Sequence, residues 1–182
     1  MASRMSKRTW LILAIVIIAV GAIVGIAMSR NSPSPSDSTP QSDEAPDFTL
    51  PTMTGANITL SELEGTPVVL LFWATWCPHC PTELHRLEAV AQQTEGEIKV
   101  IAISIDISTS MVQTFFGDYK PTMTIALDSN GEVFTDYCLP YNNIRGSIPF
   151  ALFVDNKGIV KYVKIGAFTS DEQLQEALSS IS

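Results

Sequence analysis

Two cysteines, Cys77 and Cys80, are separated by two residues in the segment WATWCPHCP, residues 73–81. An apolar run precedes this segment, and a stretch with helical spacing follows it. Two cysteines within one helical turn can close a disulfide with little change in the backbone, and the free N–H groups of a helix N-terminus stabilise a thiolate. The sequence therefore predicts thiol–disulfide exchange, in which Cys77 is the nucleophile and Cys80 resolves the mixed disulfide by attacking the sulfur of Cys77.

The residues between and after the cysteines favour a helix that starts at the motif. Pro78 suits the first helical position, because its missing N–H would have no partner there. Pro81 is still within the first turns, where a proline costs less than in mid-helix. His79 can place a partial positive charge beside Cys77, which would tune the pKa of that thiol and make the couple more oxidising.

A C-x-x-C pair is also a common half of a zinc site. The other candidate ligands are His79, His85 and Cys138, and they do not form a second pair. Redox chemistry is therefore favoured over a zinc site, an inert structural disulfide, or a copper-delivering module that would need a distant histidine. The sequence predicts no metal and no small-molecule cofactor, because the Cys77–Cys80 disulfide itself carries the electrons.

The third cysteine, Cys138, is interpreted as a small buried hydrophobic side chain, with a third redox thiol as the alternative. A peroxiredoxin-like peroxidase is a further alternative for the whole protein, and it requires a Pro-x-x-x-Thr-x-x-Cys frame. Leu70 and Ala74 occupy the proline and threonine positions of that frame before Cys77. The sequence therefore disfavours a peroxidase.

Residues 10–28 contain no charged residue and no proline. As a helix they would reach about 28 Å, close to the hydrocarbon thickness of a bilayer. Three basic residues precede the run and one, Arg30, follows it closely, which places the N-terminus in the cytoplasm. We therefore predict a cytoplasmic basic tail at 1–9 and a single-pass transmembrane anchor at 10–28. A cleaved signal peptide and a buried core helix are the alternatives.

Residues 29–46 are rich in serine, proline and acids, and such a segment cannot bury enough apolar surface to offset its ordering entropy. We interpret it as a flexible linker that leads to a domain at 47–182, outside the cytoplasm. All nineteen acidic residues but only seven of the eleven basic residues follow Arg30, so this part has a net charge of −12. A charge of this sign disfavours nucleic acid as a partner.

The domain alternates the patterns of buried strands with helical spacing. Alternation of this kind predicts an α/β sandwich with parallel strands, and a closing hairpin with the turn at 155–158 adds antiparallel strands. The expected fold class is α/β, with a mixed central sheet flanked by helices and preceded by one transmembrane helix. The expected strands are 68–73, 98–105, 124–127, 150–154 and 159–165, and the expected helices are 77–94, 110–119, 132–137 and a last one that Ser170 caps.

The motif and its surroundings resemble a known family. The pattern F-W-A-x-W-C-x-x-C, at the end of a strand and ahead of a helix, resembles the thioredoxin superfamily. The A-P-D-F-x-L of residues 45–50 and the L-S-E-L-x-G of residues 60–65 are similar to its exported TlpA/ResA branch. The similarity covers residues 45–182. It implies a thioredoxin-like sandwich, thiol–disulfide exchange on exported cysteine-containing proteins, and a membrane or extracytoplasmic partner that recharges the cysteine pair.

The resemblance also implies roles for residues outside the cysteine pair. Pro149 matches the cis-proline of the family, Ile148 before it would offer backbone groups to a substrate chain, and Trp76 would lie at the substrate-facing surface. Glu83 matches the acid that TlpA-like proteins carry on the helix. Partly buried near Cys80, it would have a raised pKa and accept the proton of Cys80 during resolution. The alternatives are a plain turn proline and a solvated glutamate favoured by the helix dipole.

The direction of electron flow stays open from the sequence. The pattern of the whole domain indicates a TlpA/ResA-like reductase, whereas His79 in C-P-H-C is more typical of DsbA-like oxidants. The sequence therefore predicts a protein thiol–disulfide oxidoreductase, a reductase in the first place and a disulfide-forming oxidant in the second.

Overall fold

The computed structural model of the chain describes residues 44–182. The predicted basic tail at 1–9, the predicted anchor at 10–28 and most of the predicted linker, up to residue 43, lie outside the described residues. Among residues 44–182, no helix combines the length and the hydropathy that crossing a membrane requires.

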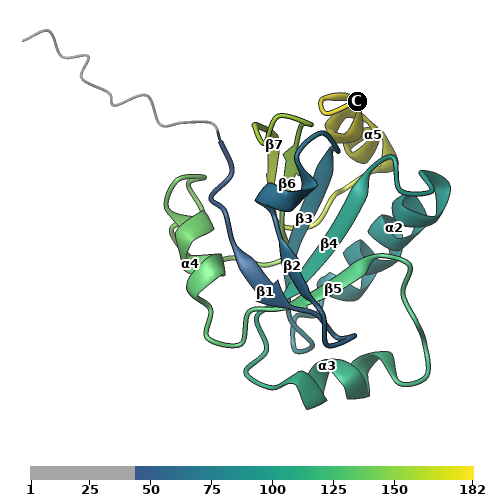
Figure 1. Cartoon of the computed structure of the whole chain (residues 1–182), viewed down its shortest axis with the longest axis vertical. Helices are drawn as coiled ribbons and strands as arrows, with labels where there is room; N and C mark the ends of the chain where they lie inside the picture. Colours follow the sequence, from purple (N-terminus) through teal and green to yellow (C-terminus); the bar gives the residue numbers. More distant parts are fainter. Residues whose placement is uncertain (1–43) are drawn as a thin grey trace, which may run out of the picture. The chain divides into compact units, whose positions relative to one another are not determined.

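The described chain alternates strands with helices around a central sheet (Figure 1). In chain order the elements are β1 (Thr49–Pro51), β2 (Asn57–Thr59), the 3-10 turn η1 (Ser61–Leu63), β3 (Val68–Trp73), α2 (Cys80–Gln93), β4 (Lys99–Ser104), α3 (Thr109–Phe116), β5 (Thr124–Leu127), α4 (Glu132–Cys138), β6 (Phe150–Val154), β7 (Val160–Ile165) and α5 (Asp171–Ser179). The predicted α/β class with a mixed sheet and flanking helices is confirmed for this part of the chain.

The central sheet has five strands in the order β5-β4-β3-β6-β7. β3 lies in the middle and runs parallel to β4, which runs parallel to β5, whereas β6 is antiparallel to both β3 and β7. The register pairs Val68 with Lys99 and Trp73 with Ser104. Because β3, β4 and β5 are parallel, their carboxyl ends meet at one edge of the sheet. Crevices at such an edge commonly hold the functional groups of open α/β sheets.

Every residue of β3 is buried, which explains why its sequence is a continuous apolar run instead of an alternating one. Side chains of a strand point alternately to the two faces of the sheet. The alternate residues that start at Val69 join the core that α2, α3 and α5 cover. Those that start at Val68 join the core that α4 and the β1–β2 hairpin cover. Figure 1 shows α4 and α2 on opposite sides of the sheet.

The end of the predicted linker packs on the domain. The N–H of Ala45 donates to the carbonyl of Gly158 at 2.9 Å, and the hydroxyl of Tyr137 donates to the carbonyl of Pro46 at 2.6 Å. Ala45 is itself buried. The packed chain therefore begins ahead of the predicted boundary at Asp47, because α4 supplies a hydroxyl donor and an apolar surface for these residues.

One buried carboxylate, Glu88 of α2, holds the segment that leads into β5. Its Oε1 accepts from the N–H of Thr122 at 2.8 Å, from Tyr119 Oη at 3.1 Å and from Gln92 Nε2 at 2.9 Å, and its Oε2 accepts from the N–H of Met123 at 3.1 Å. Burial raises the pKa of Glu88, but the hydrogen bonds from Thr122, Met123 and Gln92 outweigh burial, so the pKa is lowered.

We expect Glu88→Ala to lower the free energy of unfolding at pH 7 by about 2 kcal/mol, because the N–H groups of Thr122 and Met123, the second of them buried, lose their acceptor. Since folding lowers the pKa of Glu88, the stability from its ionised form is present above the unfolded value of 4.5 and is lost as the pH falls through the folded value. Glu88→Gln removes the charge but keeps the size of the side chain. The difference in free energy of unfolding between wild type and Glu88→Gln, measured with urea, should therefore shrink at acid pH. A difference independent of pH would contradict this account of Glu88.

Candidate active site

The cysteine motif occupies the turn between the carboxyl end of β3 and the start of α2. Cys77 and Cys80 form a disulfide, with 5.4 Å between their Cα atoms. Cys80 has no exposed surface, and Cys77 keeps 3% of its surface exposed beside Trp76, which is 63% exposed. Cys77 is therefore the more exposed member of a buried pair.

The helix begins later than the sequence indicated. His79 is the N-cap of α2, Cys80 is its first residue, and Pro81 is its second. The prediction that the helix starts at Cys77, with Pro78 in its first position, was wrong. The N–H groups of both cysteines instead donate to carbonyls three residues earlier in the turn that carries the motif. Cys77 lies just ahead of the helix, near the end where the macrodipole favours an anion.

A buried carboxylate from the neighbouring strand braces the motif. Asp106 follows β4 and is 2% exposed. Its Oδ2 accepts from the N–H of Thr75 at 2.9 Å, and its Oδ1 accepts from Thr75 Oγ1 at 2.7 Å. The hydroxyl of Ser104 donates to the same Oδ2 at 2.8 Å. Asp106 therefore fixes the backbone immediately before Trp76 and Cys77.

A second brace holds the loop that leads to Pro149. The Ile148–Pro149 peptide bond is cis, which is the isomer that the family resemblance implies. Asn143, 2% exposed, accepts from the N–H of Ser147 at 2.8 Å and donates to the carbonyl of Ser147 at 2.9 Å. One amide side chain thus occupies both backbone groups of the residue before Ile148, as a neighbouring strand would. The substrate-binding roles of Ile148 and Pro149 stay predictions.

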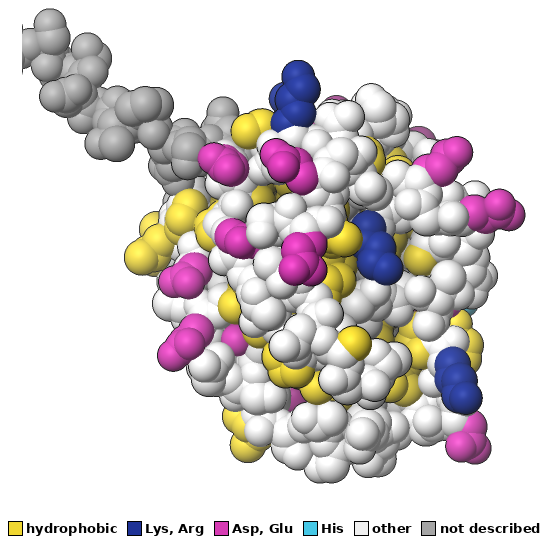
Figure 2. Space-filling view, in the orientation of Figure 1, with side chains coloured by type: hydrophobic (Ala, Val, Ile, Leu, Met, Phe, Trp, Pro, Cys, Tyr) yellow, Lys and Arg dark blue, Asp and Glu magenta, His cyan; other side chains and the backbone are white. Residues whose placement is uncertain are grey.

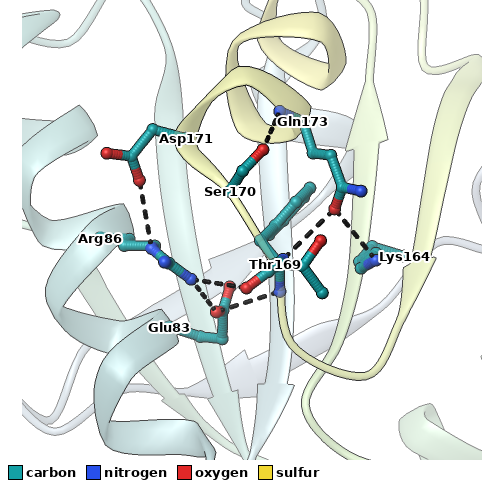
Figure 3. Close-up of polar contacts among 8 residues, drawn as sticks. Glu83, Arg86, Lys164, Thr169, Ser170, Asp171 and Gln173 are labelled. Atoms are coloured by element: carbon teal, nitrogen blue, oxygen red, sulfur yellow. Dashed lines mark hydrogen bonds and ion pairs between the residues drawn. The ribbon is translucent and has the colours of Figure 1, made fainter.

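Glu83 lies on α2 one turn after Cys80 and is 2% exposed. Its Oε1 accepts from Arg86 Nη1 at 2.8 Å and from the N–H of Phe168 at 3.2 Å (Figure 3). Burial raises the pKa of Glu83; the bonds from Arg86 and Phe168 lower it, and the net shift is upward. Glu83 is therefore a buried carboxylate with a raised pKa, and the alternative of a solvated glutamate is wrong. Its catalytic role stays a prediction.

The remaining candidate residues show no second reactive centre. His79, at the N-cap of α2, and His85, within α2, are both exposed. Cys138 is buried and free, and burial raises the pKa of its thiol, which disfavours the thiolate that redox chemistry needs. Cys138 thus resembles a small hydrophobic side chain. Within residues 44–182, no three histidine, cysteine, aspartate or glutamate side chains are grouped as a metal site.

Sequence reasoning did not single out Asp106, Asn143 and Arg86 as parts of the site. A signal existed for Asp106, because polar residues that directly follow a buried parallel strand lie at the functional edge of the sheet. Local signals existed for the other two as well, because Arg86 lies three residues after Glu83 on one helix, and an Asn side chain such as that of Asn143 commonly bonds the backbone a few residues on. Only the contact between Arg86 and the carbonyl of Phe168, 82 residues further on, depends on the folded chain.

Comparisons with known proteins agree with this geometry. The family described as AhpC/TSA matches residues 42–163, a stretch that contains the cysteine motif, Asp106 and Pro149. The chain belongs to the AhpC/TSA family. Within this family the peroxidase alternative gains no support here, because Leu70 and Ala74 stand where its frame requires proline and threonine.

Relatives of the chain are named for thiol–disulfide chemistry. The thiol-disulfide oxidoreductase ResA of Oceanobacillus iheyensis is 31% identical over 173 residues, which cover 92% of this chain and 86% of that protein. The thioredoxin-like protein YneN of Bacillus subtilis is 31% identical over 139 residues, 75% of this chain and 78% of that protein. A crystal structure from Chlorobium tepidum, assigned as thiol:disulfide interchange protein DsbE, has a TM-score of 0.68 at 27% identity and covers 78% of this chain and 97% of that one.

These relatives confirm the resemblance on which the residue roles were based. The chain is a thiol–disulfide oxidoreductase of the ResA/DsbE type, and its described part has the thioredoxin-like α/β fold. The disulfide between Cys77 and Cys80 is the redox-active group of this fold.

We expect Asn143→Ala to raise KM for a disulfide-bonded model peptide about tenfold, because Ser147 loses two hydrogen bonds worth about 1 kcal/mol each. The rate at which iodoacetamide alkylates reduced Cys77 should stay the same, since Asn143 does not touch the motif. The matched control is Asn130→Ala, which removes another side-chain bond to the backbone, from the N–H of Glu132. A lower melting temperature with no change in KM would show that Asn143 is structural only.

Proposed function

We propose that the chain is a membrane-anchored, extracytoplasmic thiol–disulfide oxidoreductase that reduces disulfides in exported cysteine-containing proteins. The observation that carries the proposal is the arrangement of three groups. Cys77 keeps a small exposed surface beside the exposed Trp76, Cys80 has none, and the buried carboxylate of Glu83 follows one turn along α2. Attack, resolution and proton transfer each need one of these groups.

The proposed location rests on the N-terminal segment. Residues 10–28 form an uncharged apolar run of spanning length with basic residues ahead of it. The alignment with ResA of Oceanobacillus iheyensis covers 173 residues, more than residues 44–182 contain, so the similarity extends into this segment. A compartment outside the cytoplasm also suits a protein that works through a disulfide.

In the reductive direction, the thiolate of Cys77 attacks a substrate disulfide. A bond forms between Cys77 Sγ and one substrate sulfur, and the other substrate sulfur leaves as a thiolate. Cys80 then gives its proton to Glu83, attacks Cys77 Sγ and expels the second substrate thiolate. Two electrons pass from the dithiol to the substrate, whose thiolates take up two protons, and the enzyme is left with the Cys77–Cys80 disulfide.

The substrate chain would lie against Trp76 and the loop before Pro149. Trp76 is exposed next to Cys77, so an apolar side chain near the substrate cysteine can pack on it. Ile148 precedes the cis peptide bond, and its backbone groups would pair with an extended substrate. In this mode of binding, the enzyme contacts mainly the substrate backbone near the cysteine and depends less on the substrate side chains. This suits a protein with several exported substrates.

A partner must return two electrons to the disulfide after each turnover. We expect a membrane or extracytoplasmic protein with its own dithiol, because thiol–disulfide exchange needs no other cofactor.

The negative charge of the domain limits its other partners. Acidic side chains are spread over the face in Figure 2 and basic ones are few, so nucleic acid is not expected to bind there.

A disulfide-forming oxidant is the second candidate, and His79 is the observation that favours it. His79 lies between the two cysteines and is the exposed N-cap of α2. A partial positive charge at this position would stabilise the Cys77 thiolate and hence the reduced form, which makes the disulfide a stronger oxidant.

The reduction potential of the Cys77–Cys80 couple separates the two directions. Equilibration with glutathione buffers should give a value nearer to about −270 mV, as in thioredoxin, than to about −120 mV, as in DsbA. A value near the oxidising end would mean that the protein inserts disulfides, and His79→Ala should then lower the potential.

We expect Glu83→Gln to slow the resolving step at least about tenfold above neutral pH, because positioned general bases contribute factors of about 100 to 10,000. The wild-type rate should rise with pH as Glu83 loses its proton, and this rise should be missing in Glu83→Gln. Rapid-mixing measurements on a preformed mixed disulfide at Cys77 give the rate. An unchanged pH–rate profile would remove Glu83 from the mechanism.

A further inference from the structure

Arg86 of α2 is the cation closest to the proposed proton acceptor. Its Nη1 donates to Glu83 Oε1 at 2.8 Å and to the carbonyl of Phe168 at 2.8 Å. Its Nε lies 3.4 Å from Asp171 Oδ1. Figure 3 shows the guanidinium between the helix that carries Glu83 and the start of α5.

The contacts of Arg86 form a closed arrangement with the β7–α5 loop. Phe168 donates its N–H to the same Glu83 Oε1 to which Arg86 donates, and it accepts from Arg86 through its carbonyl. Glu83, Arg86 and the backbone of Phe168 are therefore linked in a ring of three hydrogen bonds. Phe168 is itself buried, which holds this loop, and with it the carboxylate, in place.

We infer that Arg86 is a positioning residue for the resolving step, and that it sets the pH range over which Glu83 accepts the proton of Cys80. The inference rests on the proposed role of Glu83. It goes beyond that role because it assigns the tuning of the base to a residue that does not touch the reacting sulfurs.

The balance of charges around Glu83 supports this role. Burial favours the protonated carboxyl, and Arg86 opposes burial at hydrogen-bond distance. Lys164 of β7 adds a weaker opposing charge from the other side, and its Nζ is bonded to Gln173 of α5 instead. Asp171 faces the far side of Arg86 and is 84% exposed, so solvent screens it. Arg86 is therefore the main group that favours the ionised form of Glu83 against the effect of burial.

Arg86 has other acceptors besides Glu83, so Glu83 can change its charge without leaving the guanidinium unpaired. When Glu83 takes a proton, Arg86 loses part of one interaction but keeps the carbonyl of Phe168 and the carboxylate of Asp171. A guanidinium has five N–H donors, so these two acceptors can still be used. The protonated state of Glu83 therefore leaves Arg86, whose side chain is 25% exposed, with two partners and avoids the cost of an unpaired charge.

The direct test measures how Glu83 titrates. In the full-length protein in detergent micelles, the pH titration of the Glu83 carboxyl carbon, assigned with Glu83→Gln, should move to higher pH by about 1 to 2 units in Arg86→Met. The rising limb of the resolving rate should move by the same amount. At a pH below the new midpoint, resolution in Arg86→Met should be at least about tenfold slower than in the wild type.

Two further variants separate tuning from a merely structural contact. Lys161→Met is the matched control: it removes one cation and its ion pair with Asp155, away from Glu83, and should leave the titration where it is. Arg86→Lys keeps the charge and should restore most of the wild-type midpoint. If Arg86→Met does not fold, Arg86→Lys alone decides, because the lysine ammonium keeps the charge but lacks the fixed planar fork of the guanidinium, and it should shift the midpoint upward by a smaller amount.

The outcomes distinguish this inference from the proposal beneath it. If Glu83→Gln removes the rising limb but Arg86→Met leaves both the limb and the carboxyl titration unmoved, Arg86 only fastens α2 to the β7–α5 loop and the inference fails alone. If Glu83→Gln leaves the pH–rate profile unchanged, the proposed role of Glu83 fails, and that of Arg86 fails with it. A titration of Glu83 that moves to lower pH in Arg86→Met would also overturn the inference.

Discussion

The burial of β3 on both faces is the constraint on which the rest of the domain depends. A strand without exposed residues needs an apolar layer on each side, and these layers come from α2, α3 and α5 on one side and from α4 with the β1–β2 hairpin on the other. The chain leaves β3 at Trp73 and enters the cysteine turn at once. A slip of one residue in β3 would exchange its two faces, and it would carry Cys77 away from the loop at Pro149.

Buried polar side chains hold the loops at this edge of the sheet, whose backbone positions the strands alone do not set. Asp106 binds the backbone before Trp76, and Asn143 binds both backbone groups of Ser147. Loops near a core carry N–H and C=O groups that must find partners, and these two side chains supply them. The two surfaces that would hold a substrate, one at Cys77 and one before Pro149, are thus each fixed by a single side chain that solvent hardly reaches.

Two glutamates of α2 show how similar burial leads to opposite chemistry. Glu88 is surrounded by donors, including two backbone N–H groups, and these outweigh burial so that its pKa is lowered. Glu83 has one N–H donor and Arg86, and burial outweighs both so that its pKa is raised. The first carboxylate stays ionised and serves as a structural tie. The second has a raised pKa, so its protonated form is favoured more than in water, and it lies one turn from Cys80.

Local periodicity and the spacing of neighbouring residues were enough to predict the α/β class, the apolar central strand, the cysteine pair and the last helix with its cap at Ser170. The tertiary structure alone decided where α2 begins, since the disulfide turn takes the residues that helical spacing assigned to the helix. It also decided which polar residues serve the site. Arg86 meets the carbonyl of Phe168, 82 residues further along the chain, only after the strands have paired, and no local pattern records that pairing.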